Sequence, residues 1–350
     1  MNGPLQASVV IPTHNRPQAV RESLVHLASQ TLDPAAFEVI VVDDGSTDCA
    51  ANGSAGDYNA VLASTWPFEV RLIRQPNSGA ASARNAGAGL ARGRILVFLD
   101  DDITLESNTL ALLIGISMAK NHAIVLGTLV SNPPTPSTPF ATYILVREQS
   151  TLAKSKAEAA DGLVMVSFTQ CLTGLLAVNR DDFLTLGQFQ DPTGGWPSWD
   201  DVDFGYRADR AGYYLVRHVE ARAIHHDQSL GDVLAAGERW RRAARSAVRL
   251  FERYPELFVQ MPMFRDMGPI DWRHDPPLMV ARRLIRRLSA SAPARWALVK
   301  LIRRLEAWAP ESPMLGRLYR WTLGACVCWG YREGLGMGRG LTATLIKYPE

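Results

Sequence analysis

The sequence predicts an α/β fold, with a doubly wound and mainly parallel sheet flanked by helices, followed by a C-terminal helical segment. Short apolar runs of strand length alternate with segments of helical periodicity over residues 1–230, as is typical of parallel sheets covered by helices. Polar clusters follow several of these runs, at the positions where such sheets bind ligands. Residues 231–350 are instead helical, basic and rich in Trp, so we expect two regions with different roles.

Local patterns predict the individual elements. Residues 8–11, 37–42 and 95–99 are almost wholly apolar, which is typical of strands buried on both faces of a parallel sheet. The stretch rich in Ala and Gly that ends at Ala91 predicts a closely packed helix stopped at Gly93. Further strands are expected at residues 70–74, 124–130, 163–168 and 175–178, a helix at 105–119, a helix through Ala211, and paired strands that end at His225.

Three carboxylates, Asp100, Asp101 and Asp102, directly follow the strand at residues 95–99 in the sequence ILVFLDDD. Asp100 and Asp102 are two residues apart, so their side chains can project the same way. Crowding such charges is unfavourable unless a cation or hydrogen-bond donors neutralise them. A divalent metal is the simplest explanation, and a solvated acidic loop is the alternative.

Two other strand ends carry polar clusters, at residues 13–15 and 43–46. If these strands and the one at 95–99 are parallel, all three clusters lie on one edge of the sheet. The chain lacks G-x-G-x-x-G after the first strand and has no G-x-x-x-x-G-K-[ST]. Neither a nicotinamide site of the Rossmann type nor a P-loop is therefore supported.

Cysteine usage and hydropathy restrict the class of protein. The four cysteines (Cys49, Cys171, Cys326, Cys328) have no C-x-x-C spacing and are too few for a disulfide scaffold, which favours a reducing, cytoplasmic compartment. The N-terminal residues have neither a basic region nor a long apolar one, so no signal peptide is expected. No apolar run reaches the roughly 18 residues that a membrane-spanning helix needs.

Five motifs match a known family in order. SVVIPTHNR, VIVVDDGSTD, NSGAASARNAG, ILVFLDDD, and WDDVDFGYRADRAGY with a later HH resemble the family 2 glycosyltransferases with a GT-A fold. The resemblance covers about residues 6–230 and not the C-terminal segment. It implies that residues 1–230 form a catalytic domain that uses a nucleotide-sugar donor.

The resemblance also assigns donor-binding residues. By motif position, Thr13 and Asp43 contact the base of the nucleotide, with Arg84 nearby. The ordinary alternatives are a turn residue, a turn cap and a surface cation. Asp100 and Asp102 match the D-x-D of the family, in which the second Asp binds Mg²⁺ or Mn²⁺ and the first faces the ribose and the metal. Asp44 and Asp101 are expected to be structural.

Asp200 and Asp201 match the acidic pair that the family uses in catalysis. The resemblance makes the second carboxylate, Asp201, the base that deprotonates the acceptor hydroxyl, while Asp200 replaces a commoner Glu and orients the acceptor. Two further pairs have equally plausible structural and substrate-contacting roles. They are Asp203 with Arg207 and Trp196 with Trp199.

The family often places a metal ligand after the strand that here ends in His225 and His226. At a strand end, only one of two adjacent side chains can point to the site. We expect that ligand to be His225 rather than His226. An imidazole beside oxygen ligands suits Mn²⁺ at least as well as Mg²⁺.

The C-terminal region is strongly basic. Residues 239–350 hold 21 Lys and Arg against 9 Asp and Glu, a balance of +12, whereas the rest of the chain carries 16 against 26, a balance of −10. Residues 276–290 and 296–308 have the pattern of basic amphipathic helices with Trp, which suits an anionic membrane surface. A helical subdomain that packs on itself or on a partner chain is the alternative. No recognised nucleic-acid-binding module is present, so nucleic acid is not an expected partner.

The residues and the resemblance together predict a metal-dependent glycosyltransferase, and the resemblance implies that it inverts the configuration of the transferred sugar. We expect it to act on a glycan or glycolipid acceptor in bacterial polysaccharide or glycolipid assembly, in the cytoplasm or peripherally on the inner face of the cell membrane. A nucleotidyltransferase and a non-catalytic, glycosyltransferase-like module that tethers partners to membranes are the alternatives. The sequence leaves open the donor, the acceptor, the linkage and the oligomeric state.

Overall fold

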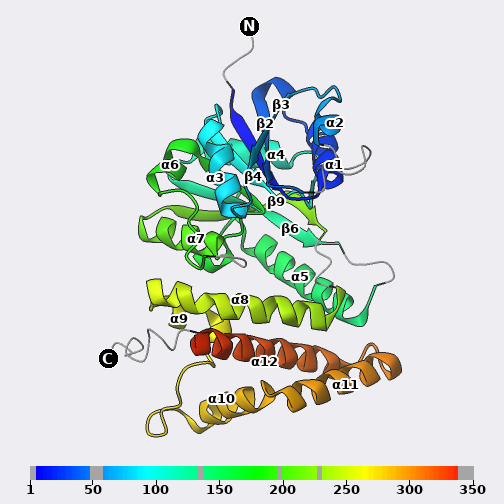
Figure 1. Ribbon diagram of the computed structural model, residues 1–350, viewed down its shortest axis with the longest axis vertical. Helices are drawn as coiled ribbons and strands as arrows, with labels where there is room; N and C mark the ends of the chain where they lie inside the picture. The colour runs from blue at the N-terminus through cyan, green and yellow to red at the C-terminus, as the bar shows by residue number, and fades with distance from the viewer. Residues whose placement is uncertain (1–4, 48–57, 133–136, 195–198, 227–230, 338–350) are drawn as a thin grey trace. The chain divides into compact units, whose positions relative to one another are not determined.

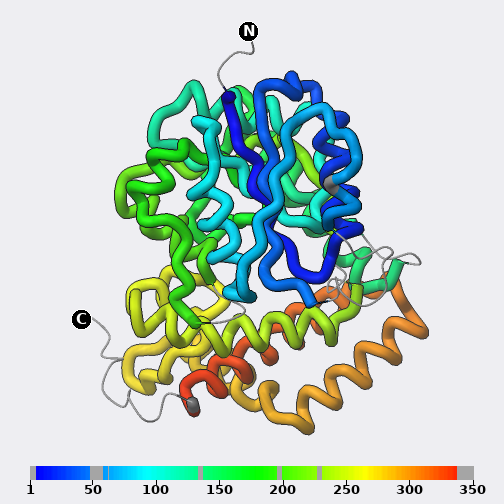
Figure 2. Tube along the Cα trace, turned by 45° about the horizontal axis from the view of Figure 1, so that its top comes forward, coloured from blue at the N-terminus to red at the C-terminus, as the bar shows by residue number. Residues whose placement is uncertain are grey.

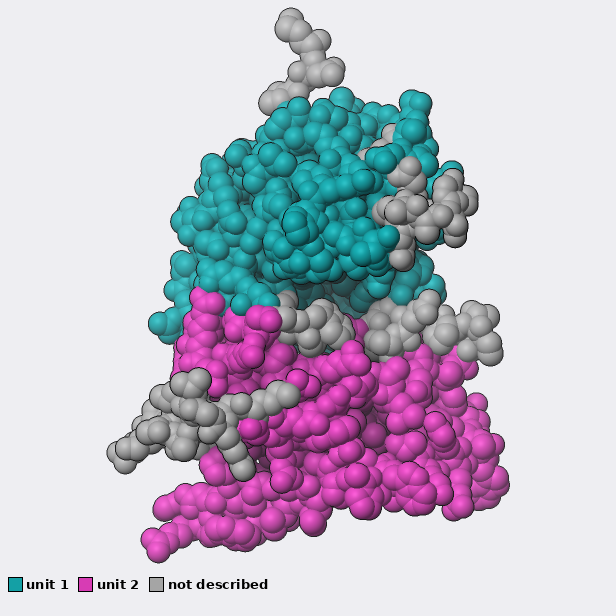
Figure 3. Space-filling model, viewed as in Figure 1, with its two compact units in different colours: residues 1–132, 148–191, 200–227 teal, residues 133–147, 192–199, 228–350 magenta. Residues whose placement is uncertain are grey.

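The structure, a computed structural model, describes residues 5–47, 58–132, 137–194, 199–226 and 231–337. The chain divides into two compact units, coloured separately in Figure 3. Unit 1 comprises residues 1–132, 148–191 and 200–227, and unit 2 comprises residues 133–147, 192–199 and 228–350. A domain boundary at residue 230 stays a prediction.

The elements alternate between strand and helix through unit 1 and become helical in unit 2 (Figure 1). The strands are β1 (Ala7–Thr13), β2 (Phe37–Asp44), β3 (Glu69–Gln75), β4 (Ile95–Leu99), β5 (Ile103–Leu105), β6 (Ala123–Ser131), β7 (Leu163–Met165), β8 (Leu175–Asn179) and β9 (Tyr214–His225). The helices are α1 (Pro17–Ala28), α2 (Tyr58–Leu62), α3 (Ala80–Leu90), α4 (Thr109–Ala119), α5 (Pro139–Glu158), α6 (Arg180–Thr185), α7 (Asp200–Arg210), α8 (Val233–Arg253), α9 (Leu257–Gln260), α10 (Pro277–Ser289), α11 (Ala292–Trp308) and α12 (Pro313–Met337).

The described strands form one mixed sheet in the order β3-β2-β1-β4-β8-β6-β9-β5, with β7 paired to β9. The predicted α/β fold is confirmed, and its parallel part is the half built from β3, β2, β1 and β4. From β8 onward the pairing is mostly antiparallel, since β8 runs back along β4 with Asn179 opposite Ile95. The sequence did not predict this change, because a buried apolar strand has the same pattern in either direction.

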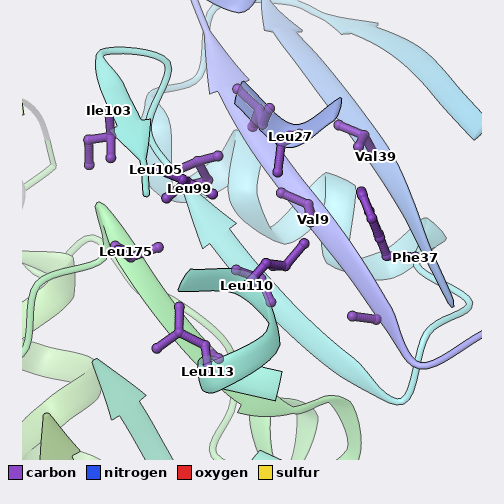
Figure 4. Packing of buried hydrophobic residues seen from close by; sticks show 14 of the residues in the cluster. Val9, Leu27, Phe37, Val39, Leu99, Ile103, Leu105, Leu110, Leu113 and Leu175 are labelled. Atoms are coloured by element: carbon purple, nitrogen blue, oxygen red, sulfur yellow. The ribbon is translucent and has the colours of Figure 1, made fainter. Parts of the chain in front are cut away.

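The central strands are buried on both faces. Alternate residues of β1, β2 and β4 pack against α1 and α4 on one face, as Figure 4 shows for Val9, Val39 and Leu99 beside Leu27 and Leu110. On the opposite face, α3 approaches the sheet closely. A methyl group added at Gly87 would lie only 2.4 Å from Cγ1 of Val10, which explains why this helix is rich in Gly and Ala.

Several elements were not predicted, including the short helix α2 at residues 58–62. The short strand β5 takes up residues 103–105, so the helix expected from residue 105 begins at Thr109. The helices α5 and α6 were missed as well. The paired strands expected before His225 are a single strand, β9, whose register against β6 shifts between Leu126 and Thr128. Such a bulge bends the strand without ending it.

Unit 2 is an assembly of helices in which α12 packs closely against α8. A Cβ atom at Gly330 would lie 1.9 Å from the carbonyl oxygen of Arg241, so only glycine allows this approach. Figures 1 and 2 show α12 between α8 and the consecutive helices α10 and α11. Ile302 of α11 and Tyr319 of α12 belong to its buried core. Among the described residues, no helix combines the length and apolar character needed to cross a membrane.

Candidate active site

The carboxyl ends of β1, β2 and β4 meet at one edge of the sheet in unit 1. Thr13 is paired with Asp43 in the parallel register of β1 and β2, and β4 runs parallel to β1 with Phe98 opposite Val10. The three polar clusters therefore lie together, as parallel pairing required. The helices α3 and α7 and the end of β9 contribute the remaining candidate residues.

The pairing of β5 with β9 brings Asp102 and His225 together. Ile103 lies opposite His225 in this antiparallel pair, and the backbone N–H of His226 donates to the carbonyl of Asp102 at 2.9 Å. The Nε2 atom of His225 lies 3.5 Å from Oδ1 of Asp102. Although burial of Asp102 acts in the opposite direction, His225 and Arg16 lower the pKa of this carboxyl, which keeps it ionised.

The neighbouring histidine is engaged elsewhere. The Nε2 atom of His226 lies 2.8 Å from the hydroxyl of Thr104, and its Nδ1 lies 3.1 Å from the side-chain nitrogen of Asn132. Because that amide nitrogen can only donate, Nδ1 accepts and Nε2 carries the proton. This arrangement supports the choice of His225 over His226 as the metal ligand.

Arg16, which the sequence analysis did not assign, contacts two of the three aspartates. Its Nη1 atom lies 3.1 Å from Oδ1 of Asp101 and 3.3 Å from Oδ2 of Asp102. The guanidinium is half exposed and supplies positive charge beside these two carboxylates. Its position as the last residue of SVVIPTHNR was the only signal in the sequence.

Asp101 connects the first strand to the acidic cluster. Its buried side chain accepts a hydrogen bond of 2.7 Å from the hydroxyl of Thr13, and its backbone carbonyl accepts one from Ser23. Burial raises the pKa of Asp101 to about 6, while the Thr13 hydrogen bond and Arg16 oppose the rise. The hydroxyl of Tyr58, also missed by sequence reasoning, lies 3.1 Å from that of Thr13. The hydroxyl of Thr13 therefore holds the side chain of Asp101 in place.

Arg84 links the acidic cluster after β4 to the acidic pair at the start of α7. From α3, its Nη2 donates to Asp100 at 2.6 Å and its Nη1 donates to Asp200 at 3.2 Å. The guanidinium is buried and its Nε has no hydrogen-bond partner within the described structure. Burial lowers the pKa of Arg84, but the carboxylates of Asp100 and Asp200 outweigh this effect and raise it. Arg84 is therefore a fixed bridge between the end of β4 and the start of α7.

Asp201 lies in the first turn of α7, directly after Asp200. Burial and the adjacent charge of Asp200 raise the pKa of Asp201 to about 7, while Arg84 opposes the rise. A carboxylate whose pKa lies near neutrality is suited to accept a proton during a reaction. The raised pKa is consistent with the assignment of Asp201 as a base.

Asp43 and Asp44, at the end of β2, hold the backbone of nearby loops. Asp43 is buried, accepts from the backbone N–H of Ser46 at 3.0 Å, and lies 3.5 Å from Nε of Arg74. Asp44 accepts 2.8 Å hydrogen bonds from the N–H groups of Ser78 and Gly79, which fixes the turn before α3. The structural role expected for Asp44 is thus visible, and Asp43 combines a turn cap with its place at the strand end.

Several residues left open by the sequence have structural contacts. Trp199 donates through Nε1 to the carbonyl of Ala243 at 2.9 Å within unit 2, so its ring is packed. Asp203 is buried and pairs with Arg207 at 2.7 Å. Trp196 lies outside the described residues.

Asp102 and His225 are a pair of side chains that fit a divalent ion. The described residues contain no group of three or more His, Cys, Asp and Glu side chains arranged around one point. Mg²⁺ and Mn²⁺ at nucleotide sites commonly take one or two protein ligands, and the substrate phosphates and water complete the shell. The oxygen and nitrogen donors of Asp102 and His225 suit that arrangement.

Comparison with known proteins agrees with this geometry. Residues 8–173 match the family model described as Glycosyl transferase family 2. This part of the chain is therefore similar to glycosyltransferase family 2. The chain is 28% identical over 240 residues to a validoxylamine A glucosyltransferase of Streptomyces hygroscopicus subsp. limoneus, which covers 62% of this chain and 51% of that protein.

A second relative of the family 2 domain is a poly(ribitol-phosphate) beta-glucosyltransferase of Bacillus spizizenii, 32% identical over 126 residues, covering 36% of this chain and 19% of that protein. The chain therefore spans about half the length of the first relative and less of the second. Among solved structures, it resembles the mannosyltransferase PcManGT of Pyrobaculum calidifontis, solved in complex with GDP-Man and Mn²⁺. The TM-score is 0.58 at 19% identity, covering 94% of this chain and 87% of the other, which confirms the GT-A fold.

Proposed function

We propose that this protein is a metal-dependent, inverting glycosyltransferase that transfers a sugar from a nucleotide-sugar donor to an acceptor hydroxyl. The observation that carries the proposal is the bridge made by Arg84, which holds Asp100 at 2.6 Å and Asp200 at 3.2 Å. The bridge joins the carboxylate after β4, which we assign to the donor side, to the acidic pair at the start of α7, which we assign to the acceptor side. The family 2 match of residues 8–173 agrees with this chemistry.

On the donor side, we assign Asp102 and His225 as ligands of Mn²⁺ or Mg²⁺, and Asp100 as a donor-facing carboxylate held by Arg84. When bound, the ion neutralises the charge that develops on the leaving diphosphate. Thr13 and Asp43 line the nucleotide end of the site at the tips of β1 and β2. Arg16 contributes a second positive charge on the same side.

On the acceptor side, Asp201 is the base and Asp200 positions the substrate. The carboxylate of Asp201 takes the proton of the acceptor hydroxyl. At the same time, the oxygen of that hydroxyl attacks the anomeric carbon of the donor sugar, and the bond from this carbon to the diphosphate breaks. A single displacement with one base inverts the configuration at that carbon. Asp200 is held by Arg84, so it can accept a hydrogen bond from the acceptor without moving.

The acceptor we propose is a glycan or a glycolipid. Two relatives are named glucosyltransferases, and the name of one of them specifies a poly(ribitol-phosphate) acceptor. A role in bacterial polysaccharide or glycolipid assembly fits this group of relatives. A lipid-linked acceptor would lie at the inner face of a membrane. The basic C-terminal helices would hold the protein at that surface.

A donor screen tests the proposal. The purified full chain is incubated with UDP-, dTDP- and GDP-sugars, with Mn²⁺ or with a chelator, and released nucleoside diphosphate is measured with and without candidate acceptors. We expect metal-dependent release from one class of donor. Release of pyrophosphate from a nucleoside triphosphate and a sugar phosphate would instead identify a nucleotidyltransferase. Absence of both binding and turnover for every donor would support a non-catalytic module.

A further inference from the structure

Three of the four arginines of α10 point toward the interior of unit 2, whereas Arg282 is exposed and pairs with Asp266 at 2.6 Å. Arg283 pairs with Asp275, and Arg287 donates to the carbonyl of Gly268 at 3.0 Å. Arg286 lies 3.7 Å from Asp266 and stacks 5.7 Å from the ring centre of Trp321. These three guanidinium groups are partly buried and have acceptors inside unit 2. The polar face of this amphipathic helix is therefore already satisfied by the protein.

The apolar face of α10 is consequently exposed. Leu278, Ile285 and Leu288 are 81%, 42% and 69% exposed, and Ala281 is exposed between them. Their spacing of three, four and three residues places all of them on one side of the helix. Amphipathic helices on a globular core normally face the other way, so this exposed apolar stripe needs a partner.

The next helix, α11, exposes Trp and basic residues together. Trp296 and Trp308, near its two ends, are 62% and 87% exposed. Lys300, Arg303 and Arg304 are exposed between them, and Nζ of Lys300 lies 3.7 Å from the ring centre of Trp296. The one acidic residue of α11, Glu306, accepts a hydrogen bond from Tyr319 of α12. The outer surface of α11 thus carries positive charge without a compensating carboxylate of its own.

We propose that the exposed apolar residues of α10 (Leu278, Ala281, Ile285, Leu288) and the exposed Trp and basic residues of α11 (Trp296, Lys300, Arg303, Arg304, Trp308) form a surface that binds an anionic lipid membrane. We call it the α10–α11 surface. Trp prefers the boundary between lipid headgroups and acyl chains, where the leucines can enter the apolar layer. The cations of α11 complement anionic headgroups.

A second copy of this chain is the competing occupant. Two such surfaces facing each other would bring the cations of both copies together, and α10 and α11 contain no exposed acidic residue to offset them. This repulsion favours the membrane over a symmetric dimer. The proposal is independent of the donor, since it concerns unit 2, whereas the candidate active site lies in unit 1.

Vesicle flotation with the full chain tests the proposal. Vesicles of phosphatidylcholine alone are compared with vesicles of equal parts phosphatidylcholine and phosphatidylglycerol, at low and high salt. We expect binding only to the anionic vesicles, partial release by salt, and a blue shift of Trp emission on binding. Each basic residue at such a surface contributes about fivefold in affinity, so Lys300→Glu with Arg304→Glu should weaken binding at least about 20-fold.

Matched variants separate the two contributions. Trp296→Ala with Trp308→Ala should weaken the salt-resistant part of binding and leave the salt-sensitive part. Arg94→Glu and Met165→Glu change one exposed cation and one exposed apolar residue in unit 1, and should leave flotation unchanged. Circular dichroism confirms that each variant is folded.

Two results would overturn the proposal. One is equal flotation of the wild type and of both double variants. The other is a full chain that ignores anionic vesicles and elutes as a dimer that Trp296→Ala with Trp308→Ala converts to a monomer. The donor screen addresses the proposed function separately, so vesicle binding without turnover and turnover without vesicle binding are distinguishable outcomes.

Discussion

The Nε2 atom of His225 lies 3.5 Å from Oδ1 of Asp102, although the two residues are far apart in the sequence. The three-residue strand β5 makes this possible, because it follows Asp102 directly and pairs with the end of β9. The contact joins the acidic cluster after β4 to the histidine at the end of β9. In the proposed assignment, these two side chains hold the metal.

Removing either proposed ligand should abolish or weaken metal-dependent donor binding. We expect Asp102→Ala to eliminate it and His225→Ala to reduce Mn²⁺ affinity at least about tenfold, since each loses a direct ligand. His226→Ala is the matched control, because its ring contacts Thr104 and Asn132 instead. Calorimetry with Mn²⁺ and donor measures each affinity. Unchanged affinity in Asp102→Ala, or a larger loss in His226→Ala than in His225→Ala, would contradict the assignment.

Asp201→Asn should preserve donor binding and lower kcat by roughly 100-fold or more. The amide keeps the shape of the side chain and removes the base, and general-base catalysis typically contributes about that much. Donor affinity and kcat are measured on the same preparation. Asp200→Asn is the comparison, and if it lowers kcat further while Asp201→Asn does not, the roles of the two residues are reversed.

The pKa of Asp201 predicts how activity depends on pH. Burial and Asp200 raise this pKa from 3.8 to about 7, so the base is protonated in acid and kcat/KM should rise with pH toward a plateau above neutrality. A pH profile of kcat/KM in the wild type shows whether the ascending limb lies in this range. A flat profile between pH 5 and 8 would argue against a titrating carboxyl as the base.

The raised pKa of Asp201 also makes the stability of the folded protein depend on pH. Because the folded-state pKa of Asp201 is raised above 3.8, its stabilising contribution is complete below that pH and is lost as pH rises through about 7. Asp201→Asn cannot titrate. Its melting temperature should therefore gain on that of the wild type as pH increases from about 4 to 7. A difference that stays constant, or that changes in the opposite direction, would show that burial does not penalise this charge.

Arg84 should contribute to stability as well as to the site. Arg84→Met leaves Asp100 and buried Asp200 without their cation, and breaking a buried pair typically costs about 3–5 kcal/mol. Arg74→Met is the control, since Arg74 is half exposed and lies 3.5 Å from Asp43. Denaturant unfolding of both variants measures the cost. A loss in Arg84→Met no larger than in Arg74→Met would mean that the bridge is not structural.

Two glycines of α3 provide a test of helix packing. Gly87→Ala should lower the free energy of unfolding by about 1–3 kcal/mol, because the new methyl group would meet Val10 at 2.4 Å and Val42 at 3.1 Å. Gly89→Ala, on the same helix, meets nothing within 4 Å and should raise stability by about 0.5–1 kcal/mol. Chemical denaturation of both variants decides between them. Equal effects would show that α3 lies farther from the sheet than described.

The local sequence was sufficient to predict the first strands and the family. Apolar runs at β1, β2 and β4 and the polar residues after them depend only on residue order, and parallel pairing then places Thr13, Asp43 and Asp100 on one edge. The family and the GT-A fold predicted from five motifs are confirmed by the matches. The roles of the individual site residues stay predictions.

Long-range contacts were decided only by the tertiary structure. The pairing of β5 with β9, the bridge from Arg84 to Asp200, and the contact of Arg16 with Asp101 each join segments whose local patterns carry no information about one another. The orientation of α10 is the clearest case. Its sequence fixes two faces, one apolar and one basic, but which face turns inward depends on acceptors such as Asp266 and Asp275 that other segments supply. An amphipathic pattern defines the faces of a helix, and only the surrounding structure determines which of them is buried.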